Sequence, residues 1–478
     1  MRFYIIILFK RIIPLYVVLL IGVAAVCQSP RSAVTNGHIT INNKDTRYTA
    51  RVREYFLPSS EKPAASVITT SYEIENTDTL NRPVVFLFNG GPGASSSPLH
   101  MNAFGPMRLL KKPDTTLLVS NPYCLLDVAD LVFIDPVGTG FTRIIDSVKA
   151  ETYMDVLADA QSVMDIINNW KKEQHRTAAP FFICGESYGT IRAVKMLSMA
   201  DQPQLKGVLL FSSILDMSLM APVSGNEMPY LLSLPTMSAI AWYHKKIERK
   251  NRTVQQVFNQ AVQFVNTDYL KALHTGNAAI NKNMLAKRMA AITGLSSTAI
   301  LNMNLRIHDS DFETQLLASE HLRIGKLNGQ VALPMEKKPY SSRDDPSLVV
   351  NSDIKKDMVG KYFTRDLGFP AEGMYKGINF IVNSKWKWVS MDAYLGYYSV
   401  LPDLEEAMKK NPQLKLLVAG GMYDLATPVY ATQYLLNHSS VPAARTHFLY
   451  YATGHSIFEN EVALKEFAAA VRLFINGN

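Results

Sequence analysis

Cysteine is scarce in this chain. Its 478 residues include three cysteines, Cys27, Cys124 and Cys184, and they form no CxxC pair. No H-E-x-x-H motif occurs either, so the common sequence patterns of zinc sites are absent. Cys184 lies within an apolar run, which indicates a buried thiol that packs as a small hydrophobic side chain. We therefore expect no disulfide framework, no metal site and no cofactor, and a fold stabilised by its hydrophobic core.

Long runs of one charge are also absent. Basic residues outnumber acidic ones by 49 to 41, but they are scattered and form only short pairs such as Lys111-Lys112. A net charge of +8 spread in this way is typical of a solvated surface and does not indicate a nucleic-acid partner. No internal repeat or low-complexity segment occurs, and the composition is 47% hydrophobic. The chain can therefore bury one large core or two.

The N-terminal segment has the composition of an export signal. Basic residues precede an uninterrupted apolar run, Ile12 to Val26. This run is shorter than the ~20 residues that a membrane-spanning helix needs, and its basic flank is typical of a secretory signal. We predict a signal peptide over residues 1–27 and a periplasmic or secreted protein. The alternatives are an uncleaved anchor, helped by the apolar stretch from Tyr4 to Phe9, and a lipid anchor at Cys27.

Short apolar runs alternate with helical patterns over much of the chain. Such runs are typical of parallel strands that are buried on both faces of a sheet, and a helical pattern such as Asp155 to Trp170 is typical of the connections. An alternating β-branched pattern between about Tyr48 and Ile74 predicts a leading antiparallel hairpin. We predict an α/β fold with a mainly parallel central sheet flanked by helices. The expected parallel strands are Val84–Phe88, Leu131–Ile134, Phe181–Cys184, Val208–Phe211, Leu414–Ala419 and Phe448–Tyr451.

The segment between Phe211 and Leu414 has a different pattern. Met, Ala, Leu, Asn and Lys recur there at helical spacing, for example from Thr253 to Leu273. This pattern predicts a largely helical insertion, a cap that lies over the edge of the sheet. The predicted organisation is a signal peptide, a first part of the core, the cap and a second part of the core, at residues 1–27, 28–215, 216–405 and 406–478.

The pentapeptide Gly185-Glu186-Ser187-Tyr188-Gly189 lies between a predicted strand and an amphipathic helix. In this context G-x-S-x-G forms a nucleophile elbow, which exposes the serine hydroxyl at the end of the sheet. Asp424 and His455 each follow a later strand, and ligands of open α/β sheets bind at such strand ends. A single Asp more often caps a turn, and a single His more often packs in the core or lies on the surface. The prediction of a catalytic triad therefore depends on all three residues following strands that end at the same edge of the sheet. We predict that His455 is the base for Ser187 and that Asp424 orients its imidazole.

A glycine-rich loop, Asn89 to Ser96, follows the first of the parallel strands. Its three glycines around a proline resemble the oxyanion loop of lipases, where a backbone N–H faces the charge that develops on the carbonyl oxygen. By position, the predicted donors are the N–H groups of Gly91 and Tyr188. A phosphate-binding loop is the alternative, but neither G-x-G-x-x-G nor a following Gly-Lys-Ser/Thr is present.

Together these segments resemble the serine carboxypeptidase family. Matches fall in order from about Val84 to Phe211 and from Leu414 to Phe474. The resemblance implies the α/β-hydrolase fold and an exported enzyme of bacterial type. It also implies removal of the C-terminal residue of peptides through an acyl-enzyme, usually best at acidic pH. The landmark segments are Asn89–Gly93 with Ser95-Ser96, Phe104–Pro106, Asn121–Tyr123, Asp135–Phe141 and Gly185–Gly189.

The resemblance also implies a site for the terminal carboxylate of the substrate. In the family, the Asn and Glu that match Asn89 and Glu186 recognise this group. A protonated Glu can donate a hydrogen bond to a carboxylate, and it loses this ability when it ionises. Four places depart from the family pattern, one of them Met422, which replaces an acidic residue common before the catalytic Asp. The family's Trp is replaced by Leu87, its second carboxylate-binding Glu by Ala103, and its proline after the catalytic His is missing from Ser456–Phe458.

Three functional hypotheses follow. The leading one is a serine-type carboxypeptidase that acts on peptides. An exported esterase or acyltransferase with the same triad stays open because of Leu87 and Ala103. A non-catalytic binding protein is the third, and the presence of nucleophile, base, acid and oxyanion glycines argues against it. Pocket walls from the cap set the preferred terminal residue, and Trp242 and Tyr243 either line that pocket or pack in a core.

Overall fold

The structure is a computed structural model. It describes residues 29–58, 62–75, 77–112, 115–199, 202–276, 281–335, 344–349, 353–388 and 397–477. The predicted signal peptide and Cys27 lie outside these residues. Within the ranges given, every helix is too short or too polar to cross a bilayer.

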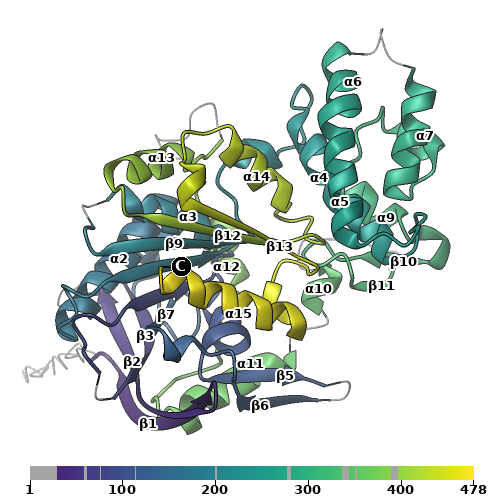
Figure 1. The fold of residues 1–478 in the computed structure, drawn as a ribbon. Coiled ribbons are helices and arrows are strands. Elements are labelled where there is room, and N and C mark those ends of the chain that lie inside the picture. Colours follow the sequence, from purple (N-terminus) through teal and green to yellow (C-terminus); the bar gives the residue numbers. More distant parts are fainter. Residues whose placement is uncertain are drawn as a thin grey trace, which may run out of the picture.

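A nine-stranded sheet forms the centre of the molecule (Figure 1). Its first three strands pair antiparallel with their neighbours, and the remaining neighbours pair parallel. All six predicted parallel strands are present, so the predicted α/β fold with a mainly parallel sheet is confirmed. In spatial order the strands are β1 (Ser32–Ile41), β2 (Lys44–Leu57), β3 (Ala65–Ile74), β7 (Asp130–Asp135), β4 (Val84–Phe88), β8 (Phe181–Glu186), β9 (Leu205–Phe211), β12 (Lys415–Gly421) and β13 (Thr446–Tyr451).

Two short hairpins lie outside this sheet, and helices account for most of the remaining chain. The hairpins are β5–β6 (Met107–Lys111, Thr116–Ser120) and β10–β11 (Leu322–Ile324, Ala332–Pro334). The α-helices are α1 (Ser147–Ala150), α2 (Val156–Glu173), α3 (Tyr188–Leu197), α4 (Met228–Tyr243), α5 (Val254–Phe264), α6 (Leu270–Thr275), α7 (Lys282–Thr293), α8 (Ser297–Asn302), α9 (Asp309–Gln315), α10 (Pro346–Val349), α11 (Asp353–Lys361), α12 (Phe380–Lys385), α13 (Leu401–Lys410), α14 (Val429–Asn437) and α15 (Glu461–Ile475).

Helices cover both faces of the sheet because successive side chains of the buried strands point to opposite faces. In β4, for example, Phe86 packs in a core with α2, α3 and α13, whereas Leu87 packs in a second core with α15. The helix α2 begins where Asp155 accepts a hydrogen bond from the Ala158 amide at 2.9 Å, and such an N-cap is worth about 1 kcal/mol. The sheet is therefore the middle layer of three.

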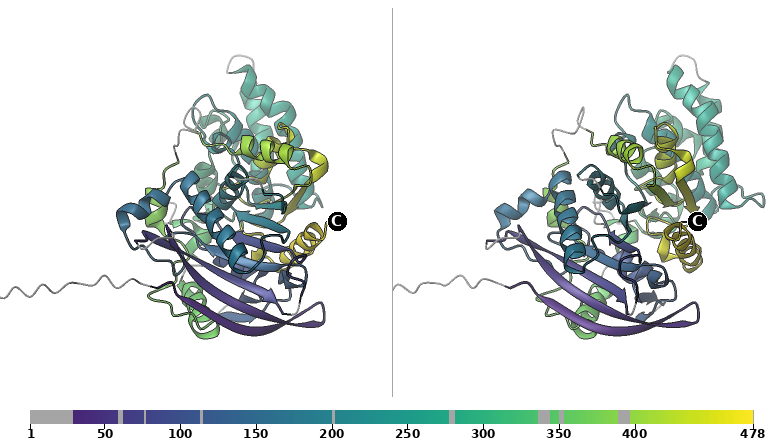
Figure 2. Two further views of the ribbon diagram at one scale, coloured as in Figure 1. Left: turned by 90° about the vertical axis from the view of Figure 1, so that its left-hand side faces the viewer. Right: turned by 60° about the vertical axis from the view of Figure 1, so that its left-hand side comes forward.

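The helices α4 to α9 form a lobe with a core of their own. In Figures 1 and 2 this teal lobe and the purple strands β1 and β2 lie at opposite ends of the molecule. The same core includes Met422 and Leu425, which flank the loop after β12. Later parts of the insertion pack elsewhere, since Tyr362 and Phe363 lie in the α15 core and Leu404 lies in the α2 core. We therefore propose a cap that is narrower than the predicted 216–405 and ends near β10.

Glu54 ties the start of the described chain to the central sheet. Its carboxylate is buried and accepts hydrogen bonds from the side chains of Arg31, Arg143 and Ser66 at 2.5 to 2.9 Å. Burial alone would raise the pKa of Glu54, but these bonds outweigh it and lower the pKa to about 2. The ionised carboxylate thus stabilises the folded state above its unfolded pKa of about 4.3, and this contribution is lost as pH falls toward 2.

We expect Glu54→Gln to lower the free energy of unfolding by about 3 kcal/mol at pH 7, because two partly buried arginines lose their buried charged partner. The deficit should shrink as pH falls from 5 to about 2, where the wild-type carboxylate is also neutral. Urea unfolding at several pH values measures it. The matched control is Glu406→Gln, which removes an exposed carboxylate paired with Lys410. A deficit that is equal for both variants, or constant with pH, would contradict this account of Glu54.

Candidate active site

The turn after β8 holds Ser187 in a strained conformation. Its φ of 59° and ψ of −131° are rare for a residue with a side chain, and they fit the predicted nucleophile elbow. The flanking glycines are needed for space. A Cβ on Gly185 would lie 2.2 Å from the Gly189 carbonyl oxygen, and one on Gly189 would lie 2.9 Å from that of Phe88. The tight turn therefore requires glycine at position 185, and its close contact with β4 requires glycine at position 189.

Asp424 and His455 lie together at the ends of β12 and β13. The His455 Nδ1 and Asp424 Oδ2 atoms are 2.7 Å apart. Asp424 is fully buried and also accepts hydrogen bonds from the Thr427 hydroxyl and from the amides of Ala426 and Thr427. Burial disfavours the imidazolium, but the Asp424 carboxylate outweighs burial and raises the pKa of His455 above its ordinary value. Asp424 therefore fixes the orientation and charge preference of the imidazole.

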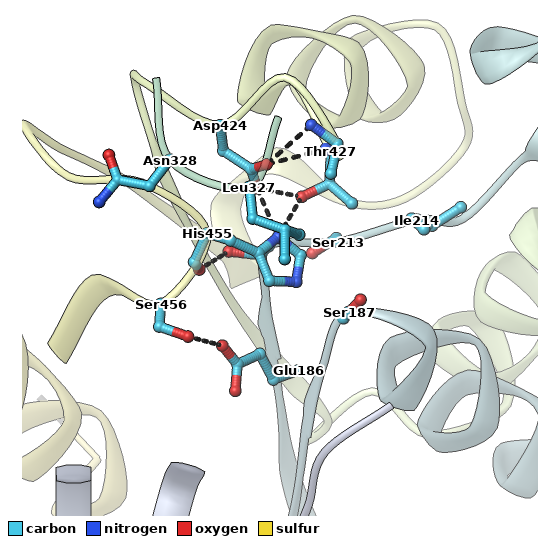
Figure 3. A network of polar contacts seen from close by, with 12 residues as sticks. Glu186, Ser187, Ser213, Ile214, Leu327, Asn328, Asp424, Thr427, His455 and Ser456 are labelled. Atoms are coloured by element: carbon cyan, nitrogen blue, oxygen red, sulfur yellow. Dashed lines mark hydrogen bonds and ion pairs between the residues drawn. The ribbon is translucent and has the colours of Figure 1, made fainter. Parts of the chain in front are cut away.

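The structure brings the predicted triad together. In Figure 3 the His455 imidazole lies between Asp424 and the turn that carries Ser187. The backbone also holds these groups in place, since the His455 amide donates to the Leu327 carbonyl at 2.7 Å and the Ser187 amide donates to the Phe211 carbonyl at 2.9 Å. The imidazole thus lies on the side of Asp424 that faces the turn of the half-buried Ser187.

The glycine-rich loop after β4 lies against the elbow. Gly91 has a φ of +98°, and a Cβ on Gly90 would lie 2.4 Å from the Tyr188 amide nitrogen. The loop backbone at Gly90 therefore touches the first turn of α3, which carries the predicted oxyanion donor Tyr188, and the other predicted donor, Gly91, is the next residue of the loop. A side chain at position 90 would clash with the Tyr188 amide, so this close approach requires glycine.

A buried ion pair connects this loop to the two helices beneath it, and the sequence alone did not reveal it. Arg192 donates to the Asn89 carbonyl at 2.8 Å and to Asp159 at 2.7 and 3.2 Å. The hydroxyl of Tyr188 donates to the same Asp159 carboxylate at 2.8 Å. The signal that could have been used is a charged residue on an otherwise apolar helix face, one in α2 and one in α3.

The predicted carboxylate-binding residues also meet. Glu186 is 2% exposed, and its Oε2 atom accepts a hydrogen bond from the side-chain amide of Asn89. Its Oε1 atom accepts from the hydroxyl of Ser456 at 3.0 Å (Figure 3). Burial raises the pKa of Glu186 to about 7. Ala103 lies in the apolar core and is fully buried, so its position supplies no second acid.

Over the described residues, no group of three or more His, Cys, Asp or Glu side chains is placed to hold a metal ion. Cys124 and Cys184 are buried free thiols, and burial raises the pKa of both. Both thiols are thus in the protonated, unreactive form.

A family model described as serine carboxypeptidase matches residues 70–453. The chain belongs to the serine carboxypeptidase family. The match includes the elbow, the glycine-rich loop, Asp424 and Thr453, and it ends two residues before His455. It confirms the resemblance and, with the sheet described above, the α/β-hydrolase fold.

Curated relatives of this serine carboxypeptidase family member match shorter segments. Serine carboxypeptidase-like 21 of Arabidopsis thaliana is 37% identical over 23% of this chain and 22% of its own length. Pheromone-processing carboxypeptidase kex1 of Schizosaccharomyces japonicus is 33% identical over 22% of this chain and 19% of its own. The chain thus spans about a fifth of the length of these relatives. Among solved structures, the peroxisomal alpha-beta-hydrolase Lpx1 of Saccharomyces cerevisiae aligns over 94% of this chain and 90% of its own at 9% identity and a TM-score of 0.40.

Proposed function

We propose that this protein is a serine-type carboxypeptidase, which hydrolyses the C-terminal peptide bond of peptides through an acyl-enzyme. The observation that carries the proposal is the buried pair of Glu186 and Asn89, which lies directly beside the elbow of Ser187. A general esterase needs the nucleophile and its base but no buried carboxyl next to them. Family membership supports the same activity.

In the proposed mechanism, the Ser187 Oγ atom attacks the carbonyl carbon of the last peptide bond while His455 takes its proton. The carbonyl oxygen becomes negative and accepts hydrogen bonds from the Gly91 and Tyr188 amides. His455 then gives the proton to the leaving nitrogen, the C–N bond breaks, and the acyl group stays on Ser187. A water molecule then attacks the acyl carbon while His455 takes its proton, the bond between that carbon and Ser187 Oγ breaks, and His455 returns the proton to Oγ. Asp424 stabilises the imidazolium in both halves of the reaction.

Glu186 distinguishes a peptide with a free C-terminus from other substrates. Its raised pKa keeps a proton available near neutral pH, and a protonated carboxyl can donate to the terminal carboxylate. Glu186 and His455 also affect each other's pKa, so they titrate as a pair. The active form of the pair carries one proton on Glu186 and a neutral imidazole. Because the pKa of His455 is raised to about 9 and that of Glu186 to about 7, this is the minor of the two one-proton arrangements. We therefore expect kcat/KM to be bell-shaped in pH, with both limbs set by the pair.

The test compares two N-blocked dipeptides that differ only in a free or an amidated C-terminus. The proposal expects a kcat/KM at least about tenfold higher for the free acid, since one charge-assisted hydrogen bond contributes about 1.5 kcal/mol or more. Equal turnover of acid and amide would contradict a carboxypeptidase. Turnover of esters without turnover of either dipeptide would favour the esterase or acyltransferase alternative.

Glu186→Gln is expected to extend activity to higher pH. The glutamine amide donates a hydrogen bond at every pH, so activity should no longer fall by about tenfold per pH unit beyond the wild-type alkaline limb. The acidic limb should then report the titration of His455 alone, because the variant has no second carboxyl that shares the proton. Kinetic pH profiles measure both limbs. Glu406→Gln, which removes an exposed carboxylate paired with Lys410 in α13, is the control and should leave the alkaline limb in place.

A further inference from the structure

The two oxygen atoms of Glu186 have different partners. Oε2 accepts from Asn89, which is itself fixed because its Oδ1 atom accepts from the Leu99 amide at 3.2 Å. Oε1 accepts from Ser456, the residue directly after His455. Glu186 is almost fully buried, whereas Ser456 is only half-buried. Ser456 is therefore the polar group that lies between a buried carboxyl and the accessible part of the site.

We propose that Ser456 is a third residue of the carboxylate-binding site. Its hydroxyl donates a hydrogen bond to the substrate carboxylate when Glu186 is protonated and to Glu186 when that carboxyl is ionised. This inference rests on the proposed function, because it concerns the site that recognises a free C-terminus. It assigns to this chain a group that compensates for the missing second acid at Ala103, whose methyl group is enclosed in the apolar core.

The argument follows from what a hydroxyl can do. A serine hydroxyl has one hydrogen to donate and two lone pairs to accept. When Glu186 is ionised, the Ser456 hydrogen is used by Oε1, as the 3.0 Å contact shows. When Oε1 carries a proton, Glu186 donates to the Ser456 oxygen, and the hydroxyl hydrogen is free for an oxygen of the substrate carboxylate. No covalent bond changes in the protein beyond the one proton on Glu186.

The charged groups around Glu186 are consistent with this switch. His455 lies on the same loop as Ser456, and its positive charge favours the ionised carboxylate. Glu459, in the short helix that follows, has the opposite effect, while Asn89 and Ser456 favour ionisation through hydrogen bonds. A negatively charged substrate also opposes a second negative charge at Glu186. Substrate binding therefore favours the protonated carboxyl and with it the outward-donating Ser456.

The experiment compares Ser456→Ala and Ser456→Thr with the wild type on the free-acid and amidated dipeptides. In Ser456→Ala the ratio of kcat/KM for acid over amide should fall about tenfold, mainly through KM for the acid. The alkaline limb should move to higher pH, since a bond that favours ionised Glu186 is lost. Ser456→Thr keeps the hydroxyl and should have the wild-type ratio of kcat/KM for acid over amide and the wild-type position of the alkaline limb. Ser439→Ala, at the remote end of α14, is the control.

The possible outcomes distinguish a failure of the role proposed for Ser456 from a failure of the proposed carboxypeptidase activity. Equal losses on acid and amide in Ser456→Ala, or no change in ratio and pH profile, would overturn the role of Ser456 while leaving the carboxypeptidase proposal intact. A Ser456→Thr variant that behaves like Ser456→Ala would also overturn it. A wild type that does not distinguish acid from amide would instead contradict the proposed function itself.

Discussion

Replacing Ser187 with alanine is expected to abolish labelling by a fluorophosphonate probe and to lower kcat by about a millionfold. No other group in the proposed mechanism can form the acyl-enzyme. In the variant, the base His455 would have no hydroxyl to deprotonate. Alanine and serine have similar backbone preferences, so the strained turn at φ 59° should persist and the protein should stay folded.

Labelling of the purified protein followed by peptide mapping measures the first effect, and dipeptide turnover measures the second. Ser198→Ala, at the exposed C-terminal end of α3, is the matched control and should label like the wild type. A wild type that does not label would favour the non-catalytic binding protein. Persistent labelling of Ser187→Ala would show that the nucleophile is another residue.

The parallel strands and the elbow could be predicted because their signals are local. Strands such as Val84–Phe88 are buried on both faces, which leaves a continuous apolar run in the sequence. The elbow requires glycine at two positions for steric reasons, and this requirement is visible as a motif. The order of Ser187, Asp424 and His455 along the chain could likewise be read without coordinates.

The edge strand β1 was not predicted, because its signal is weak. It alternates between exposed and half-buried residues over most of its length and pairs only with β2. The extent of the cap depends on contacts that a helical pattern does not encode. Tyr362 lies in the predicted cap, yet its hydroxyl is 2.9 Å from that of Tyr72 in β3, 290 residues earlier. Periodicity indicates that a segment is helical but not which surface covers it.

The polar groups that hydrogen-bond the site residues could not be predicted from the sequence either. Thr427 and Ser456 each hydrogen-bond a predicted site residue, Asp424 and Glu186, from positions adjacent to the motifs. In the sequence they are single hydroxyl residues with no distinctive spacing. Their partners are fixed only when the ends of β8, β12 and β13 meet, and sequence separation then no longer matters. Ser456 also begins the segment that lacks the proline of the family pattern.

Replacing Asp424 with asparagine is expected to lower kcat by about 10⁴-fold while the fold is retained. The Asp424 carboxylate accepts a hydrogen bond from His455 Nδ1–H, with Nδ1 and Oδ2 2.7 Å apart, which leaves Nε2 as the acceptor for the Ser187 hydrogen. An asparagine amide that donates to Nδ1 stabilises the opposite tautomer, whose Nε2 carries a hydrogen and cannot take one. The amides of Ala426 and Thr427 can still donate to the asparagine oxygen, so the turn keeps its hydrogen bonds.

The charge of Asp424 makes a second prediction about pH. Because the carboxylate raises the pKa of His455, Asp424→Asn should shift the acidic limb of the residual activity to lower pH. Steady-state kinetics over pH and the NMR signal of the Nδ1 proton measure the two effects separately. Thr427→Val is the matched comparison, since it removes one hydroxyl bond to Asp424 and keeps the charge. It should cost about tenfold in kcat. If both variants lose similar activity, Asp424 acts through local packing and not by controlling the imidazole.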